Sequence, residues 1–168
     1  MENIDEGNVI QLKEKIVQIS RVARVVKGGK RLRFRVLAVV GDEKGNVGVA
    51  LGKASETATA IRKAIERARK SMIKINIAGT TVPHPFIGEE GSARVLLKPA
   101  VKGTGVIAGG AVRAVLEACG IKDIITKSLG SSNQINVSYA TFNALKSMKN
   151  IDQVAKHLGK HPKEMLES

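Results

Sequence analysis

The N-terminal half of the chain contains a long basic and apolar stretch, residues 15–40, KIVQISRVARVVKGGKRLRFRVLAVV. Eight lysines and arginines and no acidic residue fall between Lys15 and Arg35. The pair Gly28-Gly29 at its centre can adopt positive φ without a Cβ clash, which favours a tight turn. After this turn, apolar residues alternate with arginines, as in a half-buried strand. The stretch therefore predicts a β-hairpin with a positively charged tip.

The flanking residues extend this hairpin into a small α+β domain. The predicted strands are residues 16–26 and 32–40, and residues 47–51 alternate as a third strand. A helix is predicted over residues 56–74, with Ser55 as its N-cap and Glu56 in its first turn. Its apolar stripe is Ala58, Ile61, Ile65, Ala68 and Met72. The first domain is therefore predicted to be a three-stranded antiparallel sheet with one helix.

The second half predicts a further sheet with two helices. Pro83 and Pro85 cannot continue a helix, so we place a domain boundary near residues 77–80. The predicted elements are strand 82–87, turn 88–91, strand 93–98, helix 109–118, strand 123–128 and helix 133–148. The predicted organisation is a flexible N-terminus 1–10, domains 11–78 and 79–150, and a C-terminal tail 151–168 in which Pro162 opens a final turn.

The composition narrows the class of function. A net charge of +13 and a pI of about 10.1 favour binding to polyanions. No apolar run reaches the roughly 18 residues that a membrane span needs, and the acidic start is neither a secretory nor a transit signal. The single cysteine, Cys119, fits a reducing compartment. These features predict a cytoplasmic polyanion binder that has no membrane partner.

The aromatic content points to the kind of nucleic acid. Modules that bind single strands stack bases on aromatic side chains. This chain has one tyrosine, three phenylalanines and no tryptophan. Recognition through phosphates, sugars and shape is therefore expected, which favours structured RNA or a duplex.

The candidate RNA contacts are the basic residues of the hairpin and of the first helix, together with the turn glycines. A charged helix face is usually exposed to solvent with no binding role. Residues 62–74, however, contain six basic side chains and one acidic side chain, and this imbalance favours a surface that faces RNA. The full set is Arg21, Arg24, Lys27, Gly28, Gly29, Lys30, Arg31, Arg33, Lys53, Arg62, Lys63, Arg67 and Lys70.

A glycine-rich segment, residues 99–110 (PAVKGTGVIAGG), matches the G-x-G-x-x-A form of a dinucleotide fingerprint, and Asp123 follows Gly103 by twenty residues. The chain lacks repeated βαβ units, and Asp123 opens a predicted strand where a ribose-binding acid should end one. Anion binding by backbone N–H groups, or close packing against a partner chain, is favoured over a cofactor site. The residues concerned are Lys102, Gly103, Thr104, Gly105, Gly109, Gly110 and Arg113.

No enzyme is predicted. His84, His157 and His161 are scattered and offer no metal-ligand spacing. Cys119 lies on an apolar helix with no obvious base, so a small buried side chain is the better interpretation. No cofactor, metal or small-molecule substrate is expected.

Two segments resemble a known family. The pattern from Gly29 to Gly48, GKxxxFxVxxVVGDxxGxVG, resembles the signature of the bacterial small-subunit ribosomal protein S5 family. Residues 102–115 (KGTGVIAGGAVRAV) and 130–137 (GSSNQINV) resemble C-terminal segments of that family. One departure is Gln134, where the family typically has a proline that pre-sets φ at a helix start.

The resemblance implies a structural component of the small subunit. It implies an N-terminal domain similar to a double-stranded-RNA-binding domain, and a C-terminal domain with a left-handed βαβ unit. The hairpin tip, residues 26–31, would reach small-subunit rRNA near the decoding head and neck, where spectinomycin-resistance changes cluster in the family. The segment 103–113 would meet ribosomal protein S4 at an interface linked to decoding accuracy. The C-terminal domain would also meet protein S8, and the family lines the mRNA entry path.

Two alternatives remain open at this stage. A free-standing duplex-RNA-binding regulator would use the same chemistry as the ribosomal protein. A nucleotide-dependent enzyme built on residues 103–110 is the other alternative.

Overall fold

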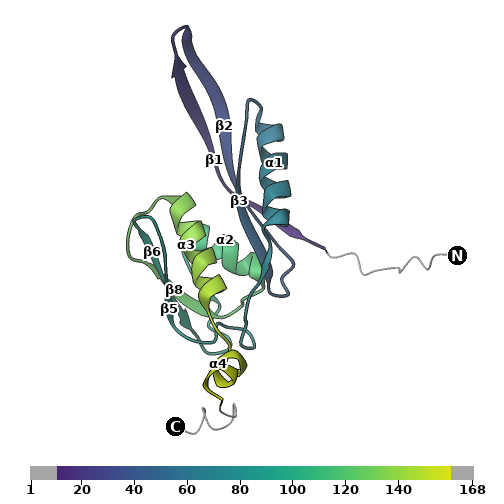
Figure 1. Cartoon of the computed structure of the whole chain (residues 1–168), viewed down its shortest axis with the longest axis vertical. Helices are drawn as coiled ribbons and strands as arrows, with labels where there is room; N and C mark the ends of the chain where they lie inside the picture. The colour runs from purple at the N-terminus through teal and green to yellow at the C-terminus, as the bar shows by residue number, and fades with distance from the viewer. Residues whose placement is uncertain (1–10, 160–168) are drawn as a thin grey trace, which may run out of the picture.

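The computed structural model describes residues 11–159 as an α+β protein whose two halves pack against each other (Figure 1). The predictions of a flexible segment 1–10 and of a turn at Pro162, together with His161 and the end of the predicted tail, lie outside the described residues. Within residues 11–159 no helix is long and apolar enough to cross a membrane.

The N-terminal sheet contains the predicted hairpin. Its strand order is β1-β2-β3-β4, with every neighbouring pair antiparallel. The strands are β1 (Lys13–Val26), β2 (Gly29–Gly41), β3 (Asn46–Ala54) and β4 (Ile73–Lys74). The three predicted strands are confirmed, and β4 is a short fourth strand that the sequence did not indicate.

Helix α1 (Thr57–Lys70) ends earlier than predicted, because Ile73 and Lys74 pair with β3 instead of continuing the helix. Its N-cap is Glu56, so the prediction of Ser55 as the cap is wrong. The buried face also differs from the predicted stripe, and Ala58 is exposed. The buried residues of α1 are Ala60, Ala64 and Ala68.

Two glycines of β3 explain this change of face. A Cβ on Gly48 would lie 2.1 Å from the Ala68 carbonyl oxygen, and one on Gly52 would lie 2.2 Å from that of Ala60. The helix therefore rests directly on glycine backbone, and only small side chains fit beneath it. The isoleucines of the predicted stripe lie partly buried at the border of this contact.

The C-terminal sheet has the strand order β5-β6-β8-β7. Its strands are β5 (Phe86–Glu90), β6 (Ala93–Pro99), β7 (Val106–Ile107) and β8 (Ile124–Ser128). The predicted strand 82–87 and turn 88–91 are both displaced, because Gly88 lies inside β5. A Cβ on Gly88 would lie 2.1 Å from the Ala140 carbonyl oxygen, so this glycine serves a close approach to a helix and not a turn.

Three helices belong to the second half: α2 (Gly110–Cys119), α3 (Gln134–Ser147) and α4 (Ile151–Leu158). The Asn133 side chain accepts a hydrogen bond from the Ile135 N–H, which caps α3 in the absence of the family proline at Gln134. Helix α4 falls in the predicted tail, and an Asn150–Gln153 capping box begins it. Strands β7 and β8 are parallel and flank α2, as a βαβ unit requires; the left-handed sense of this connection stays a prediction.

One hydrophobic core joins the two halves. Leu37 and Val39 of β2 belong to the same buried cluster as Val115 and Cys119 of α2. The other face of the N-terminal sheet, which includes Val36, packs against α1. The sheet is therefore covered on one face by α1 and on the other by the C-terminal half.

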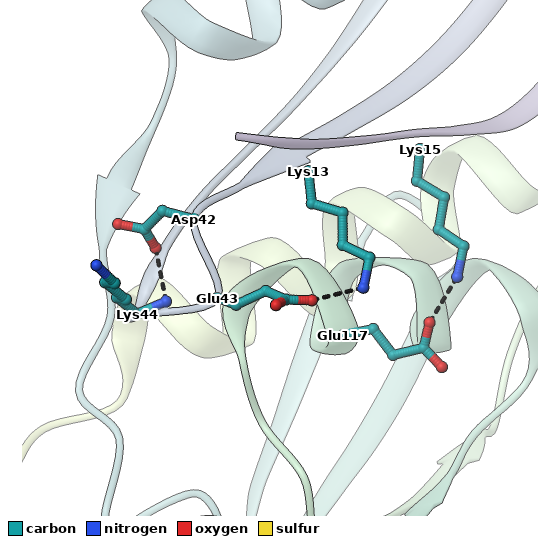
Figure 2. Close-up of polar contacts among 6 residues, drawn as sticks. All are labelled: Lys13, Lys15, Asp42, Glu43, Lys44 and Glu117. Atoms are coloured by element: carbon teal, nitrogen blue, oxygen red, sulfur yellow. Dashed lines mark hydrogen bonds and ion pairs between the residues drawn. The ribbon is translucent and has the colours of Figure 1, made fainter. Parts of the chain in front are cut away.

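The turn between β2 and β3 makes the polar junction shown in Figure 2. The Glu43 N–H donates to the Ala118 carbonyl at 3.1 Å, and the Gly45 N–H donates to that of Cys119 at 2.9 Å. Two ion pairs lie beside these bonds, Lys13 with Glu43 and Lys15 with Glu117. Backbone hydrogen bonds thus join α2 to the N-terminal sheet, and the two exposed ion pairs lie beside them.

Candidate nucleic-acid interface

The far end of the β1–β2 hairpin projects beyond α1 and beyond the region where the two halves pack together (Figure 1). Its turn is Lys27-Gly28, and Gly29 has a φ of +134°, which L side chains rarely adopt. Every residue from Ala23 to Arg33 is exposed. The tip therefore offers two lysines and open backbone to a partner, with no packing role for its side chains within the described chain.

The strand register sorts the hairpin cations by face. Arg24 lies directly opposite Arg31, and Arg33 lies opposite Val22. On the next strand Lys53 lies opposite Arg35. These positions share one face, which we call the arginine row: Arg24, Arg31, Arg33, Arg35 and Lys53. Like charges directly opposite each other destabilise a sheet, so a bound anion would relieve repulsion along this row.

The arginine row continues the sheet face that carries Leu37 and Val39. Side chains two residues apart on a strand point to the same face, so Arg31, Arg33 and Arg35 lead directly into these two buried residues. The C-terminal half covers the face at Leu37, and the arginines begin where this cover ends. One strand face therefore serves as core at one end and as a cationic surface at the other.

Arg35 is a candidate that the sequence reasoning left out of the predicted contacts. Its Nε is buried, with no hydrogen-bond partner among the described residues. The alternation of arginines in the sequence already placed it beside Arg33, so the signal was present. We add it to the candidate set.

Arg21 does not join the arginine row. It lies opposite Phe34, whose side chain packs on the α1 side of the sheet. Lys30, opposite Val25, also shares that face by register. The hairpin therefore presents cations on both faces, with the denser set on the face away from α1.

The cations of α1 form a separate surface. Arg62, Lys63 and Lys70 are exposed, on the helix that covers the opposite face from the arginine row. Arg67 Nη1 donates to the Leu51 carbonyl at 3.0 Å, which occupies this guanidinium at the edge of β3. The predicted contacts thus fall into two basic surfaces on opposite faces of the N-terminal sheet, and not into one patch.

The glycine segment has an internal anchor. Asp123 Oδ1 accepts hydrogen bonds from the N–H groups of Gly103 at 2.9 Å and Gly105 at 3.0 Å. Both glycines have positive φ. The pKa of Asp123 is lowered chiefly by the hydrogen bond from the Gly105 N–H and then by the hydrogen bond from the Thr80 side chain. The twenty-residue spacing from Gly103 to Asp123 matches that of a dinucleotide site, but here it separates a glycine loop from the carboxylate that anchors it.

This anchoring corrects part of the anion-binding prediction. The N–H groups of Gly103 and Gly105 point at Asp123, so they are not available to an external anion. Thr104 is likewise occupied, because its hydroxyl donates to the Val101 carbonyl at 2.7 Å. Lys102 is exposed, and the role of this segment as a protein interface stays a prediction.

The start of α2 remains open. Gly109 is the N-cap and Gly110 the first helical residue, and a Cβ on either would meet nothing within 4 Å. Arg113 Nη2 donates to the Val106 carbonyl at 2.9 Å. A hollow of about 610 Å³ lies between this helix start, β8 and the start of α3. The predicted anion or protein contact at Gly109 and Gly110 is untested.

The cysteine and the two histidines within the described residues lie in packed or hydrogen-bonded positions. Cys119 is buried, and this burial raises the pKa of its thiol to about 12. The His84 ring lies edge-on to Phe86, and His157 Nδ1 lies 2.9 Å from the Gln153 carbonyl oxygen. In the part of the chain that the structure describes, no three His, Cys, Asp or Glu side chains group as metal ligands would.

Two protein-family models match the chain, and together they span most of it. "Ribosomal protein S5, N-terminal domain" matches residues 12–76, which contain the hairpin, the arginine row and α1. "Ribosomal protein S5, C-terminal domain" matches residues 88–158, which contain the glycine segment and helices α2 to α4. The N-terminal match precedes the C-terminal match along the chain, and the two matches correspond to the two sheets described above. The chain belongs to the ribosomal protein S5 family, whose members are proteins of the small ribosomal subunit.

Proposed function

We propose that this protein is a structural, rRNA-binding constituent of the small ribosomal subunit in the cytoplasm, without catalytic activity of its own. The observation that carries the proposal is the arginine row on a hairpin that projects from the folded body. Arg24 and Arg31 oppose each other there, and no acidic side chain lies between Lys15 and Arg35 to neutralise them. Phosphate groups are the natural partners of such a surface.

The hairpin would bind rRNA by charge and by close backbone approach. Lysines at the tip and arginines along the row would contact phosphates, the arginines in a bidentate manner. A Cβ added at Gly28 or Gly29 would meet nothing within 4 Å, so the RNA backbone could come close to the peptide there. These contacts fix position and orientation without reading base sequence.

Further partners follow from the family. The glycine segment from Gly103 to Arg113 would meet protein S4, and the C-terminal half would also contact protein S8. A place beside the mRNA entry path would connect these contacts with subunit assembly and decoding accuracy. Substitutions at the hairpin tip would then alter spectinomycin sensitivity.

Sucrose-gradient sedimentation of a tagged copy from cells tests the proposal. Migration at one copy per small subunit, retained when magnesium is lowered in a parallel run, is the expected result. A protein that stays at the top of both gradients is not a stable subunit component, and a free duplex-RNA-binding regulator would then replace the ribosomal role. Calorimetry with ATP and NAD tests the enzyme alternative, and we expect no heat of binding.

A further inference from the structure

A groove runs beside α1 on the face of the N-terminal sheet that this helix covers. Helix α1 packs on β2 and β3, which leaves the edge strand β1 largely open on this face. Ile16 of β1 lies opposite Ala38, which shares a buried cluster with α1, yet 43% of Ile16 is accessible. Ile19 lies opposite Val36 of the same cluster, and 48% of Ile19 is accessible. The exposure of two isoleucines beside a helix needs an explanation.

The groove contains a hollow of about 480 Å³ between Glu14 of β1 and one stripe of α1. The stripe includes Ala58, Arg62 and Ile65, which are three or four positions apart and therefore share one side of the helix. Ile61 also lines the hollow. Ala58 is exposed, and both isoleucines of the stripe are only partly buried. The hollow therefore has an aliphatic lining with charged side chains at its border, as an interaction site often has.

The described part of the chain begins beside this groove. Leu12 packs against the same buried cluster as Ile65, and the Glu14 carboxylate forms an ion pair with Arg69. Along the helix axis, Ile65 and Ala58 are about 10 Å apart. Ten residues precede the described part, and a segment of that length spans up to roughly 33 Å when extended. The preceding segment is therefore long enough to follow the groove past Ala58.

We propose that this groove is the docking site for residues 1–10 of the same chain, MENIDEGNVI. The segment supplies Ile4, Val9 and Ile10 for the aliphatic lining, and it carries three acidic residues and no lysine or arginine. Helix α1 complements this charge, because it carries five basic residues and one acidic residue. The segment is tethered beside the groove, so its effective concentration there is on the order of 1 mM, and weak contacts are enough to hold it.

Other occupants fit the groove less well. RNA would set phosphates against the aliphatic side chains, and the hollow has no aromatic ring on which a base could stack. A second copy of this chain would bring its own charge of +13 against the cations of α1. The inference goes beyond the proposed function, because it concerns a contact within one chain and applies to the free protein.

A docked segment would shield the basic surface of α1. The carboxylates of Glu2, Asp5 and Glu6 would lie near Arg62 and Lys63, which are exposed. Phosphates that bind this surface would then have to displace the segment. The groove would therefore make the second basic surface weaker in the free protein than the charges of α1 alone suggest.

Cysteine alkylation in the free, full-length protein tests the docking. Ala58→Cys places a thiol in the groove, and Thr59→Cys is the matched control, because Thr59 is exposed on the same turn of α1 but does not line the hollow. The native Cys119 is buried, its thiol has a pKa of about 12, and it adds little background. We expect the Ala58→Cys thiol to react about fivefold more slowly than the control, as in a groove that is open about a fifth of the time. Equal rates would overturn the proposal.

A second set of substitutions identifies the occupant. Ile4→Ser, Val9→Ser and Ile10→Ser, made together in the Ala58→Cys protein, should restore the alkylation rate to that of the Thr59→Cys control. A thiol that stays protected would show that something other than residues 1–10 covers the groove. The protection should not change when the protein is diluted, because the contact is within one chain. Protection that falls on dilution would indicate a second copy and would overturn the proposal.

The same serine substitutions test the shielding, since they leave the net charge unchanged. In filter binding with a duplex RNA, the triple serine variant should bind severalfold more tightly than the wild type. Unchanged affinity, with the groove thiol released, would overturn the shielding but not the docking. A protein that neither binds RNA nor sediments with small subunits would overturn the proposed function, and the alkylation rates would still decide whether the segment docks. Protection that appears only in assembled subunits would assign the groove to another subunit component and would overturn the docking.

Discussion

Gly41 and Ala118 are in backbone contact: a Cβ on Gly41 would lie 2.0 Å from the Ala118 carbonyl oxygen. Gly41 is the last residue of β2, and Ala118 lies in the last turn of α2. Gly120, the C-cap of α2, makes a similar contact with the β2–β3 turn, because a Cβ on Gly120 would lie 2.1 Å from the Glu43 carbonyl oxygen. The two matched family domains therefore meet through bare backbone at these points, and this contact sets their relative position.

Gly41→Ala should destabilise the protein strongly. The added methyl group would collide with backbone that cannot swing away, so β2 or α2 must shift. We expect a loss of about 3 kcal/mol in the free energy of unfolding, at the upper end of typical overpacking penalties. Urea denaturation followed by circular dichroism measures this change.

Gly28→Ala is the matched control for that experiment. Gly28 lies at the hairpin tip without positive φ, and a Cβ there would meet nothing within 4 Å. Its unfolding midpoint should stay close to that of the wild type. Equal midpoints for both variants would mean that the contact between Gly41 and Ala118 contributes little to the packing of the two halves.

Asp123→Asn should lower stability near neutral pH and much less in acid. The native state lowers the pKa of this carboxyl from its ordinary 3.8, chiefly through the Gly105 N–H and then the Thr80 side chain. The charged form therefore stabilises the fold above pH 3.8, and this contribution is lost as the pH falls through the native-state pKa. Melting temperatures of both proteins should differ near neutral pH and converge in acid.

Glu66→Gln controls for a general effect of charge, since Glu66 is an exposed carboxylate on α1. It should leave the melting temperature nearly unchanged across the same pH range. An Asp123→Asn protein that melts with the wild type near neutral pH would show that asparagine holds the glycine loop equally well.

The hairpin and the alternation of its arginines could be predicted from the sequence because their signals are local. Paired glycines and a period of two specify the turn, the strand and which side chains share a face of β2. Which face of the sheet α1 covers depends on packing between distant segments. The sequence alone therefore could not place Arg21 apart from the arginine row, or separate the cations of α1 from it.

Glycines with a packing role were the main source of error. Gly88 stands among turn-forming residues, yet it lies inside β5 because α3 approaches its backbone. Gly48 and Gly52 likewise determine which alanines of α1 are buried. A glycine needed for a close approach and one needed for a turn look alike in sequence, because the approaching helix lies far along the chain.

The ion pair between Lys15 and Glu117 should contribute little to stability. Lys15 Nζ lies 2.5 Å from Glu117 Oε2 and joins β1 to α2 (Figure 2), but both side chains keep more than a third of their surface accessible. Solvent screening limits such pairs to about 1 kcal/mol or less. A double-mutant cycle with Lys15→Ala and Glu117→Ala should give a coupling energy in that range. A coupling several times larger would show that the junction depends on this charge pair.

Lys27→Glu should weaken binding to small-subunit rRNA whatever the RNA sequence, because phosphate contacts carry no base information. The change removes one cation at the hairpin tip and adds an anion. The slope of log affinity against log salt should therefore become shallower by about one to two units, measured by filter binding between about 50 and 200 mM salt. Lys44→Glu, an exposed lysine in the β2–β3 turn, makes the same change of charge away from the tip. The specific phosphate contact is contradicted if both variants change the slope equally, because a shared effect would reflect only the net charge of the protein.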